Sequence, residues 1–227
     1  SDASRPIKQK EIDACREGGV EYIEFKVAFD GLAVVVNPRN SWVDSLSVAE
    51  LKKIWEPSSQ GSVVKWSQVR NGFPDKEIQL FGPGTDSGTF DYFTEVISGK
   101  PGSSRGDYTA SEDDNVLVEG VASNEGGLGY FGLAYYQENK DKLKVVPIKG
   151  SNGKAVVPSQ ETVLDGSYSP LSRPLLIYVN KNSLKTKPAV KKFVQYYLEH
   201  AATLSEEVGY VPLPQSDYEA GLRKLSW

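Results

Sequence analysis

The sequence contains no methionine and only one cysteine and one histidine among its 227 residues. A single cysteine, Cys15, excludes a disulfide within the chain, and we predict that it is a small buried apolar residue. No Cys/His spacing indicates a zinc site. The one histidine, His200, lies in a segment with helical periodicity, and we expect a solvated helix residue there, not a catalytic base. The sequence therefore offers little for metal or nucleophilic chemistry.

Long apolar runs and an excess of basic residues are also absent. No run approaches the roughly 20 residues that span a bilayer. The net charge is −4, from 26 basic and 30 acidic residues, which does not indicate a nucleic-acid binder. An anion can still be bound, because helix starts present free N–H groups. The chain begins at Ser1 with no signal-peptide pattern, so we expect it to be processed, truncated or only partly represented.

Helix and strand signals alternate along the chain, which predicts an α/β fold with mostly parallel sheets. Expected helices cover residues 7–16, 48–55, 90–97, 115–121 and 190–201, and a last one starts at residue 216. Expected strands cover residues 22–29, 32–36, 78–81, 143–148 and 175–179. Capping boxes, Ser47 with Glu50 and Ser216 with Glu219, mark two of the helix starts. Asp113 or Asp114 is the expected cap of the helix at 115–121.

The most informative segment is 81–90, which reads Phe-Gly-Pro-Gly-Thr-Asp-Ser-Gly-Thr-Phe. It combines a strand end, a glycine-rich turn and a helix start, where N–H groups and a partial positive charge suit an anion. Ser87 and Thr89 add hydroxyl donors, and Gly88 lets a ligand approach the backbone. The spacing matches neither the dinucleotide nor the Walker glycine pattern, and Thr85 excludes a serine nucleophile elbow. An ordinary capped turn remains the alternative.

Two arginines in loops are candidate cationic ligands, Arg105 and Arg5. The alternative for each is a solvated side chain or a weak surface ion pair. Arg105 also opens an Arg-Gly-Asp triplet, which we attribute to chance and not to integrin binding.

Five segments taken in order resemble one family. They are 3–7 (Ala-Ser-Arg-Pro-Ile), 30–37 (Asp-Gly-Leu-Ala-Val-Val-Val-Asn), 85–90 (Thr-Asp-Ser-Gly-Thr-Phe), 129–136 (Gly-Tyr-Phe-Gly-Leu-Ala-Tyr-Tyr) and 174–179 (Pro-Leu-Leu-Ile-Tyr-Val). Together they make the chain similar to the periplasmic phosphate-binding proteins of bacterial phosphate ABC transporters, over nearly its whole length. The Ser-Gly-Thr triplet at 87–89 looks like the oxyanion loop of that family.

The resemblance implies two α/β lobes joined by two crossing strands, with phosphate held in the cleft by a hinge closure. The first lobe would comprise residues 1–36 and 176–227, and the second residues 37–175. It implies a binding protein with no cofactor, no metal and no enzymatic activity. Its partners would be inorganic phosphate and a membrane permease. Its location would be periplasmic or otherwise outside the cytoplasm, with membrane anchoring through the N-terminus as one form.

The chain departs from the family at several points. The family's N-terminal segment has no counterpart, so the first lobe is expected to be incomplete unless that segment exists as a separate chain. Many members carry an arginine where this chain has Pro83, and we expect Arg105 to replace it. Many members also carry an aspartate near the position of Ser4, where Arg5 is adjacent here. Asp86 is the nearest carboxylate to the loop, although pairing with Arg105 or capping the helix is the favoured role for it.

Three functions are therefore compared. Phosphate binding without bond breaking is the first. A related oxyanion such as sulfate or molybdate, bound by the same fold, is the second. A phosphate-ester hydrolase, the third, would need a nucleophile with a base or a metal cluster. The acidic run 112–114 is the nearest approach to such a cluster, and it is better explained as a helix start.

Overall fold

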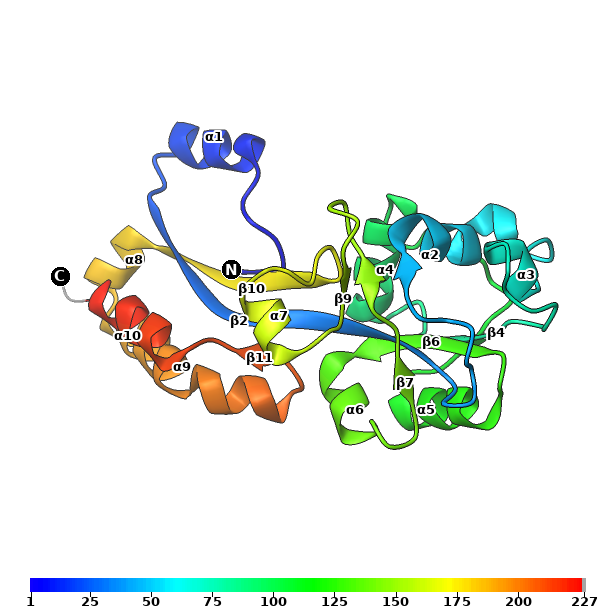
Figure 1. The fold of residues 1–227 in the computed structure, drawn as a ribbon. Coiled ribbons are helices and arrows are strands. Elements are labelled where there is room, and N and C mark those ends of the chain that lie inside the picture. The colour runs from blue at the N-terminus through cyan, green and yellow to red at the C-terminus, as the bar shows by residue number, and fades with distance from the viewer. Residues whose placement is uncertain (226–227) are drawn as a thin grey trace. The chain divides into compact units, whose positions relative to one another are not determined.

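The computed structural model describes residues 1–225 and divides into two compact units. Unit 1 is built from Ser1–Asp30 and from Arg173 onward, and unit 2 from Gly31–Ser172. The chain passes between the units twice, inside the long strand β2 (Tyr22–Val36) and at the first residue of β10 (Ser172–Asn180) (Figure 1). The resemblance implies lobe boundaries after residues 36 and 175, and the compact units divide after Asp30, inside β2, and after Ser172, at the start of β10.

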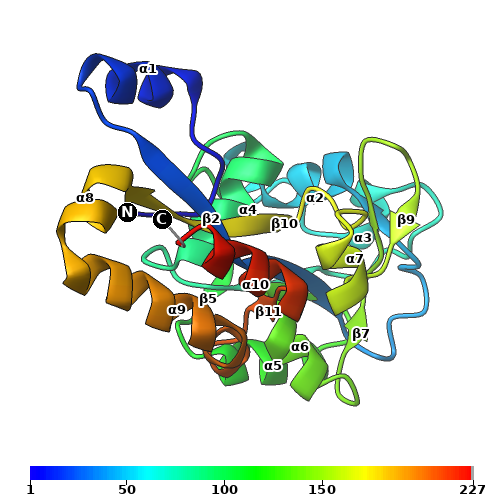
Figure 2. The ribbon, with the colours of Figure 1, turned by 90° about the vertical axis from the view of Figure 1, so that its left-hand side faces the viewer.

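In unit 1, helices pack against β2 up to Asp30 and against β10 from Arg173 onward. Its other elements are β1 (Asp2–Ala3), α1 (Gln9–Glu17), α8 (Lys181–Thr186), α9 (Pro188–Glu207), β11 (Val211–Pro212) and α10 (Gln215–Arg223). β1 pairs antiparallel with β10, and β11 pairs antiparallel with β2. The core joins Phe25, Val27, Ile177, Val179, Leu184, Val194, Leu198 and Leu225. In Figures 1 and 2, α1 stands across β2 and β10 from α9 and α10, and it contains no buried residue.

Unit 2 carries the remaining elements. They are β3 (Leu46–Ser47), α2 (Val48–Trp55), η1 (Pro57–Ser59), α3 (Trp66–Val69), β4 (Gln79–Gly82), α4 (Gly88–Ser98), β5 (Thr109–Ala110), α5 (Asp114–Ser123), β6 (Gly127–Gly132), α6 (Leu133–Glu138), β7 (Lys144–Val145), β8 (Ile148–Lys149), β9 (Ala155–Val156) and α7 (Gln160–Leu164). Trp55, Trp66, Phe93, Tyr130 and Phe131 are its largest fully buried aromatic side chains besides Tyr168.

The sheets are mixed, so the expectation of mostly parallel sheets is wrong. β4 lies parallel to β5 and β6, and β3 lies parallel to β8. In contrast, β2 pairs antiparallel with β6, β7 and β11. A strand buried on both faces, such as residues 32–36, has the same apolar pattern whichever way its neighbours run. The pattern therefore identified the strand but not its direction of pairing.

Three expected helix starts can be compared with the structure. Ser47 caps α2, and its backbone N–H donates to Glu50 at 2.8 Å, which confirms the first capping box. Asp113 caps α5 by accepting from Asn115 N. The second capping box is wrong, because α10 begins one residue earlier, after Pro214, with no side-chain cap. The fixed φ of that proline suits the residue before a helix without help from a hydroxyl.

Two other expectations need correction. The strand expected at 143–148 is broken into β7 and β8, with Pro147, which has no N–H for a ladder, between them. The apolar stripe expected along α9 is buried at Val194, Leu198 and Ala201, but Phe193 is 64% exposed. Phe193 lies at the edge of the apolar stripe, where the rest of unit 1 leaves its side chain exposed.

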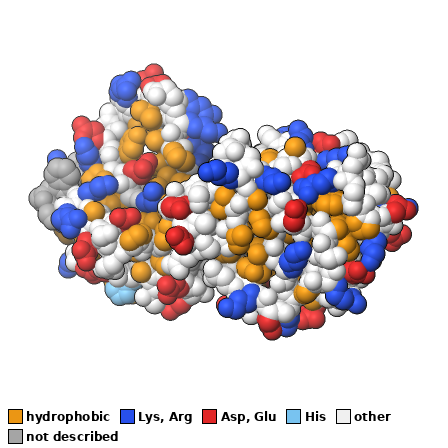
Figure 3. All heavy atoms as spheres, viewed as in Figure 1, with side chains coloured by type: hydrophobic (Ala, Val, Ile, Leu, Met, Phe, Trp, Pro, Cys, Tyr) orange, Lys and Arg blue, Asp and Glu red, His pale blue; other side chains and the backbone are white. Residues whose placement is uncertain are grey.

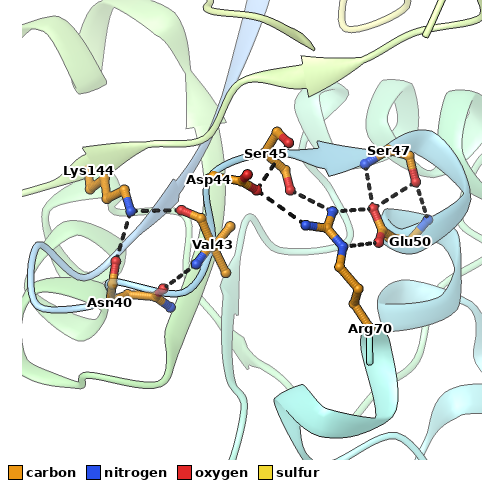
Figure 4. A network of polar contacts seen from close by, with 8 residues as sticks. All are labelled: Asn40, Val43, Asp44, Ser45, Ser47, Glu50, Arg70 and Lys144. Carbon is orange, nitrogen blue, oxygen red and sulfur yellow. Dashed lines mark hydrogen bonds and ion pairs between the residues drawn. The ribbon is translucent and has the colours of Figure 1, made fainter. Parts of the chain in front are cut away.

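A polar network holds the start of α2 in place (Figure 4). Arg70 donates to both carboxylate oxygens of Glu50, at 2.6 and 2.9 Å, to the Ser45 carbonyl and to Asp44. Partial burial alone would raise the pKa of Glu50, but the hydrogen bonds from Arg70 and Ser47 lower it to about 2. The capping box of α2 is thus fixed by a side chain twenty residues further along the chain.

Candidate anion-binding site

The glycine-rich turn connects β4 to α4 and is closed by its own hydrogen bonds. Ser87 is the N-cap of α4, and its Oγ accepts from Thr89 N at 3.1 Å. Ser87 N donates to the Gly84 carbonyl, also at 3.1 Å. The Ser87 hydroxyl can still donate its own hydrogen, for which residues 1–225 show no acceptor. The turn therefore presents a hydroxyl donor at the positive end of an eleven-residue helix.

The surface around this helix start is open to a ligand. Ser87 and Thr89 are half-buried, while Asp86 and Gly88 are exposed. A Cβ added at Gly88 would meet no protein atom within 4 Å, so packing does not require glycine there. Open space beside the backbone is what an approaching oxyanion needs.

A second segment supports the turn from behind. Tyr108 Oη donates to the Pro83 carbonyl at 2.9 Å, and Ser111 N donates to the Gly82 carbonyl at 3.1 Å. β5 lies between these two contacts and pairs with the last residues of β4. The Glu112 carboxylate occupies the space where a Cβ of Gly84 would stand. Sequence reasoning missed Tyr108, and only its position two residues after the Arg-Gly of the same loop could have drawn attention to it.

Arg105 is placed differently from the expectation of an exposed cationic ligand. The side chain is 3% exposed. Its Nε and Nη2 donate to the two carboxylate oxygens of Asp107, and its Nη1 donates to the carbonyls of Ile54 and Val63 at 3.0 and 2.9 Å. Four of five N–H donors are thus used within unit 2. Two parallel hydrogen bonds from Arg105 to an oxyanion would require some of these bonds to break. The role of Arg105 as the cationic ligand of the site stays a prediction, and these contacts do not support it.

Asp86 has neither of the two structural roles favoured for it. Asp107, not Asp86, pairs with Arg105, and the hydrogen bonds from Arg105 lower the pKa of Asp107 to about 2. Ser87, not Asp86, caps α4. Asp86 is an exposed carboxylate beside the helix start, and its role as an acceptor for a ligand proton stays a prediction.

The unit 1 candidates, Ser4 and Arg5, have separate surroundings. Arg5 is exposed and forms an ion pair with Glu11 at 2.7 Å; hydrogen bonding by Arg5 lowers the pKa of Glu11 to about 2. Ser4 Oγ instead accepts from Arg173 at 3.2 Å. The arginine beside Ser4 is therefore Arg173, which sequence reasoning did not single out. The sequence signal for Arg173 was its position just before the apolar run of β10.

Arg173 is itself paired with a buried carboxylate. Its guanidinium lies 3.0 Å from Asp30 Oδ2, and the two side chains are 18% and 8% exposed. Burial raises the pKa of Asp30 even though Arg173 offsets part of this effect. Ser4, Asp30 and Arg173 thus form one polar cluster inside unit 1. The contact of Ser4 and Arg5 with a ligand stays a prediction.

Cys15 and His200 are the other chemically notable side chains. Cys15 is half-buried on α1, and not buried as expected, because α1 packs only on one side. His200 is exposed and stacks on Tyr196, with ring centroids 4.0 Å apart. Within residues 1–225, no group of three His, Cys, Asp or Glu residues is placed to hold a metal ion. Over the same residues, no helix is long and apolar enough to cross a membrane.

The fold, with two α/β units between which the chain passes in β2 and again at the start of β10, is the two-lobe fold of the substrate-binding proteins. The chain belongs to the PBP superfamily, since it matches the PBP superfamily domain over residues 3–200. This finding confirms the expected fold class and the family resemblance. The family is one of substrate-binding proteins, which are generally non-enzymatic.

Individual relatives agree with this assignment. The chain is 51% identical over 225 residues to protein SphX of Synechococcus elongatus, covering 99% of this chain and 66% of SphX. It is 41% identical over 227 residues to phosphate-binding protein PstS of Staphylococcus saprophyticus, covering 99% of this chain and 68% of PstS. A crystal structure of a possible phosphate-binding protein from Planctomyces limnophilus is 51% identical and superposes with a TM-score of 0.94, covering 99% of this chain and 79% of that one. The chain thus spans about two thirds of the length of the curated relatives.

Proposed function

We propose that this protein binds inorganic phosphate and delivers it to the membrane permease of an ABC transporter. The observation that carries the proposal is the turn at the start of α4, where the Ser87 hydroxyl and the space beside Gly88 lie at the positive end of a helix. Relatives named as phosphate-binding proteins support it. A permease as partner, and a periplasmic or other extracytoplasmic location, belong to the same proposal.

The proposed activity is binding without bond breaking. A tetrahedral oxyanion offers several acceptors, and each charge-assisted hydrogen bond contributes about 1.5–3 kcal/mol. Hydrolysis of a phosphate ester would instead need a nucleophile activated by a base, and His200 is an exposed helix residue whose Nδ1 lies 2.9 Å from the Tyr196 carbonyl. We therefore expect no turnover of p-nitrophenyl phosphate, with or without divalent metal. Turnover that Ser87→Ala abolishes would instead identify a hydrolase.

Substitutions in the turn test the phosphate proposal directly. Ser87→Ala and Thr89→Ala should each weaken phosphate binding by about 1–3 kcal/mol, because each removes a hydrogen bond to a charged group. Gly88→Val should weaken it more, since its branched side chain would fill the open space beside the backbone. Isothermal calorimetry with inorganic phosphate on the full-length protein measures these losses, and sulfate and molybdate titrated in parallel test the alternative oxyanions.

A matched control lies at the other end of the same helix. The Ser98 hydroxyl is buried and has no hydrogen-bond partner among residues 1–225. Ser98→Ala removes the same atoms as Ser87→Ala and should leave the phosphate affinity unchanged. Unchanged affinity in all three variants of the turn would exclude the turn from the binding site.

Two of the grooves on unit 1 have mainly apolar surfaces. One, of about 670 Å³, lies between α1 and the strands and includes Ile7, Cys15, Val20, Tyr22 and Tyr178. The other, of about 710 Å³, is lined in part by Leu176, Tyr197, Leu204, Val208 and Tyr210. Figure 3 shows hydrophobic side chains gathered on this unit around α1. We propose that the family's N-terminal segment, in the same chain or as a separate one, covers these grooves.

Adding such a segment should stabilise the protein and strengthen phosphate binding. The 227-residue chain alone should bind a hydrophobic dye such as ANS, because Leu204 and Val208 are 47% and 66% exposed. Co-expression with the part of SphX outside the matched 225 residues should raise the melting temperature and suppress dye binding. Tight phosphate binding by the 227-residue chain alone, with a cooperative melt and no dye binding, would contradict this proposal.

A further inference from the structure

We propose that Tyr108 is a positioning residue for the anion-binding turn, acting through its hydrogen bond to the Pro83 carbonyl. The inference rests on the proposed function of the turn but concerns a different residue and a different contact. Tyr108 would touch no ligand. It would determine where the backbone between β4 and α4 lies.

The first step of the argument concerns the route of the chain. β4 ends at Gly82 and α4 begins at Gly88, so the turn between them has no ladder hydrogen bonds of its own. Pro83 is the first residue of the turn and has no N–H, so its carbonyl is the backbone group through which it can be held from outside. Tyr108 donates to that carbonyl at 2.9 Å. Loss of this bond frees the turn at the point where sheet pairing stops.

The second step concerns how Tyr108 is itself held. The ring stacks on Phe90 at 6.5 Å and meets Trp55 edge-on at 5.5 Å. On its N-terminal side, Arg105 is tied to Asp107 and to the carbonyls of Ile54 and Val63. These contacts place Arg105 in the same supporting segment. Arg105 would thus support the segment that holds the turn, and would not contact the ligand.

The third step compares Tyr108 with Tyr130, a second tyrosine whose ring lies beside Gly82. A Cβ added at Gly82 would lie 3.0 Å from the ring of Tyr130 and 3.4 Å from that of Tyr108, so two tyrosine rings enclose the strand end. Tyr130 is fully buried, and its hydroxyl has no hydrogen-bond partner among residues 1–225. Tyr108→Phe and Tyr130→Phe thus remove the same atom from neighbouring rings, but only the first breaks a bond to the turn.

The test compares these two variants in the full-length protein. Hydrogen exchange measured by mass spectrometry should be about tenfold faster in peptides covering residues 82–90 of Tyr108→Phe, and unchanged in Tyr130→Phe. Peptides of α5 serve as the internal reference, since exchange there reports any general loss of stability. Replacement of Tyr108 by 4-aminophenylalanine restores an N–H donor to Pro83 and should restore slow exchange.

Calorimetry with inorganic phosphate is the second readout. Tyr108→Phe should weaken binding by about threefold to tenfold, as expected for one neutral hydrogen bond, and Tyr130→Phe by less than twofold. A wild-type protein that binds no phosphate would end the proposed function, while the exchange experiment would still decide the role of Tyr108. Unchanged exchange at residues 82–90 in Tyr108→Phe, or equal acceleration in both variants and in α5, would overturn the inference.

Discussion

Replacing Arg105 by alanine should lower the free energy of unfolding of unit 2 by about 2–4 kcal/mol, as expected for a buried charge that leaves its partners unpaired. The Ile54 and Val63 carbonyls lose their donor, and Asp107 loses both bonds to the guanidinium. Arg105→Lys should recover only part of the loss, because an ammonium cannot reach all three partners in the same geometry. Urea denaturation followed by tryptophan fluorescence measures the change, since Trp55 lies beside this segment.

An exposed ion pair of the same unit provides the control. Lys142 and Glu119 lie 3.1 Å apart, with side chains 49% and 64% exposed. Lys142→Ala should change the free energy of unfolding by less than about 1 kcal/mol. A similarly small effect of Arg105→Ala would show that the hydrogen bonds of Arg105 contribute little to the free energy of unfolding.

The same variants separate the two roles considered for Arg105. If the guanidinium contacts phosphate, Arg105→Lys should lose affinity even when corrected for stability, and Arg5→Ala should lose less. If the segment only positions the turn, affinity should follow the hydrogen exchange of residues 82–90 across the variants. A complex structure with the guanidinium farther than about 3.5 Å from every ligand oxygen would end the ligand role.

The sequence was sufficient to predict the parts of the molecule that depend on local signals. The turn at 81–90, the capping box at Ser47 and the long amphipathic helix all follow from neighbours within a few residues. The family resemblance supplied the two-lobe fold, which periodicity alone did not. Local patterns failed where a distant group decided the outcome, as with the direction of strand pairing.

The candidate site shows the same division. Ser87 and Thr89 were predicted to lie at a helix start, and the structure places them there. Arg105 was expected to face a ligand because this chain has Pro83 where many members of the family carry an arginine. Besides Asp107, its partners are backbone carbonyls some forty to fifty residues away, which no spacing rule identifies. Arg173 was missed for the same reason, since its partner Asp30 lies on another strand.

The cluster at Asp30 leads to the second large effect. Arg173→Met should lower the free energy of unfolding by about 3–5 kcal/mol near pH 8, because it leaves a buried carboxylate without a counter-charge. Asp30 is 8% exposed, and burial already raises its pKa in the wild-type protein. Removing Arg173 removes the charge that limits this rise, so the folded-state pKa should increase further.

The sign of the pH dependence follows from the raised pKa. A carboxyl group whose pKa is higher in the folded than in the unfolded state binds more protons when folded, so stability falls as pH rises through that range. The deficit of Arg173→Met should therefore be small near pH 4 and grow with pH by up to about 1.4 kcal/mol per unit until the folded-state pKa is passed. Asp30→Asn in the same background removes the titrating group and should restore much of the stability at pH 8. Chemical denaturation at several pH values measures both effects, and a deficit independent of pH in Arg173→Met would show that the loss comes from packing and from the bond to Ser4, not from the buried charge.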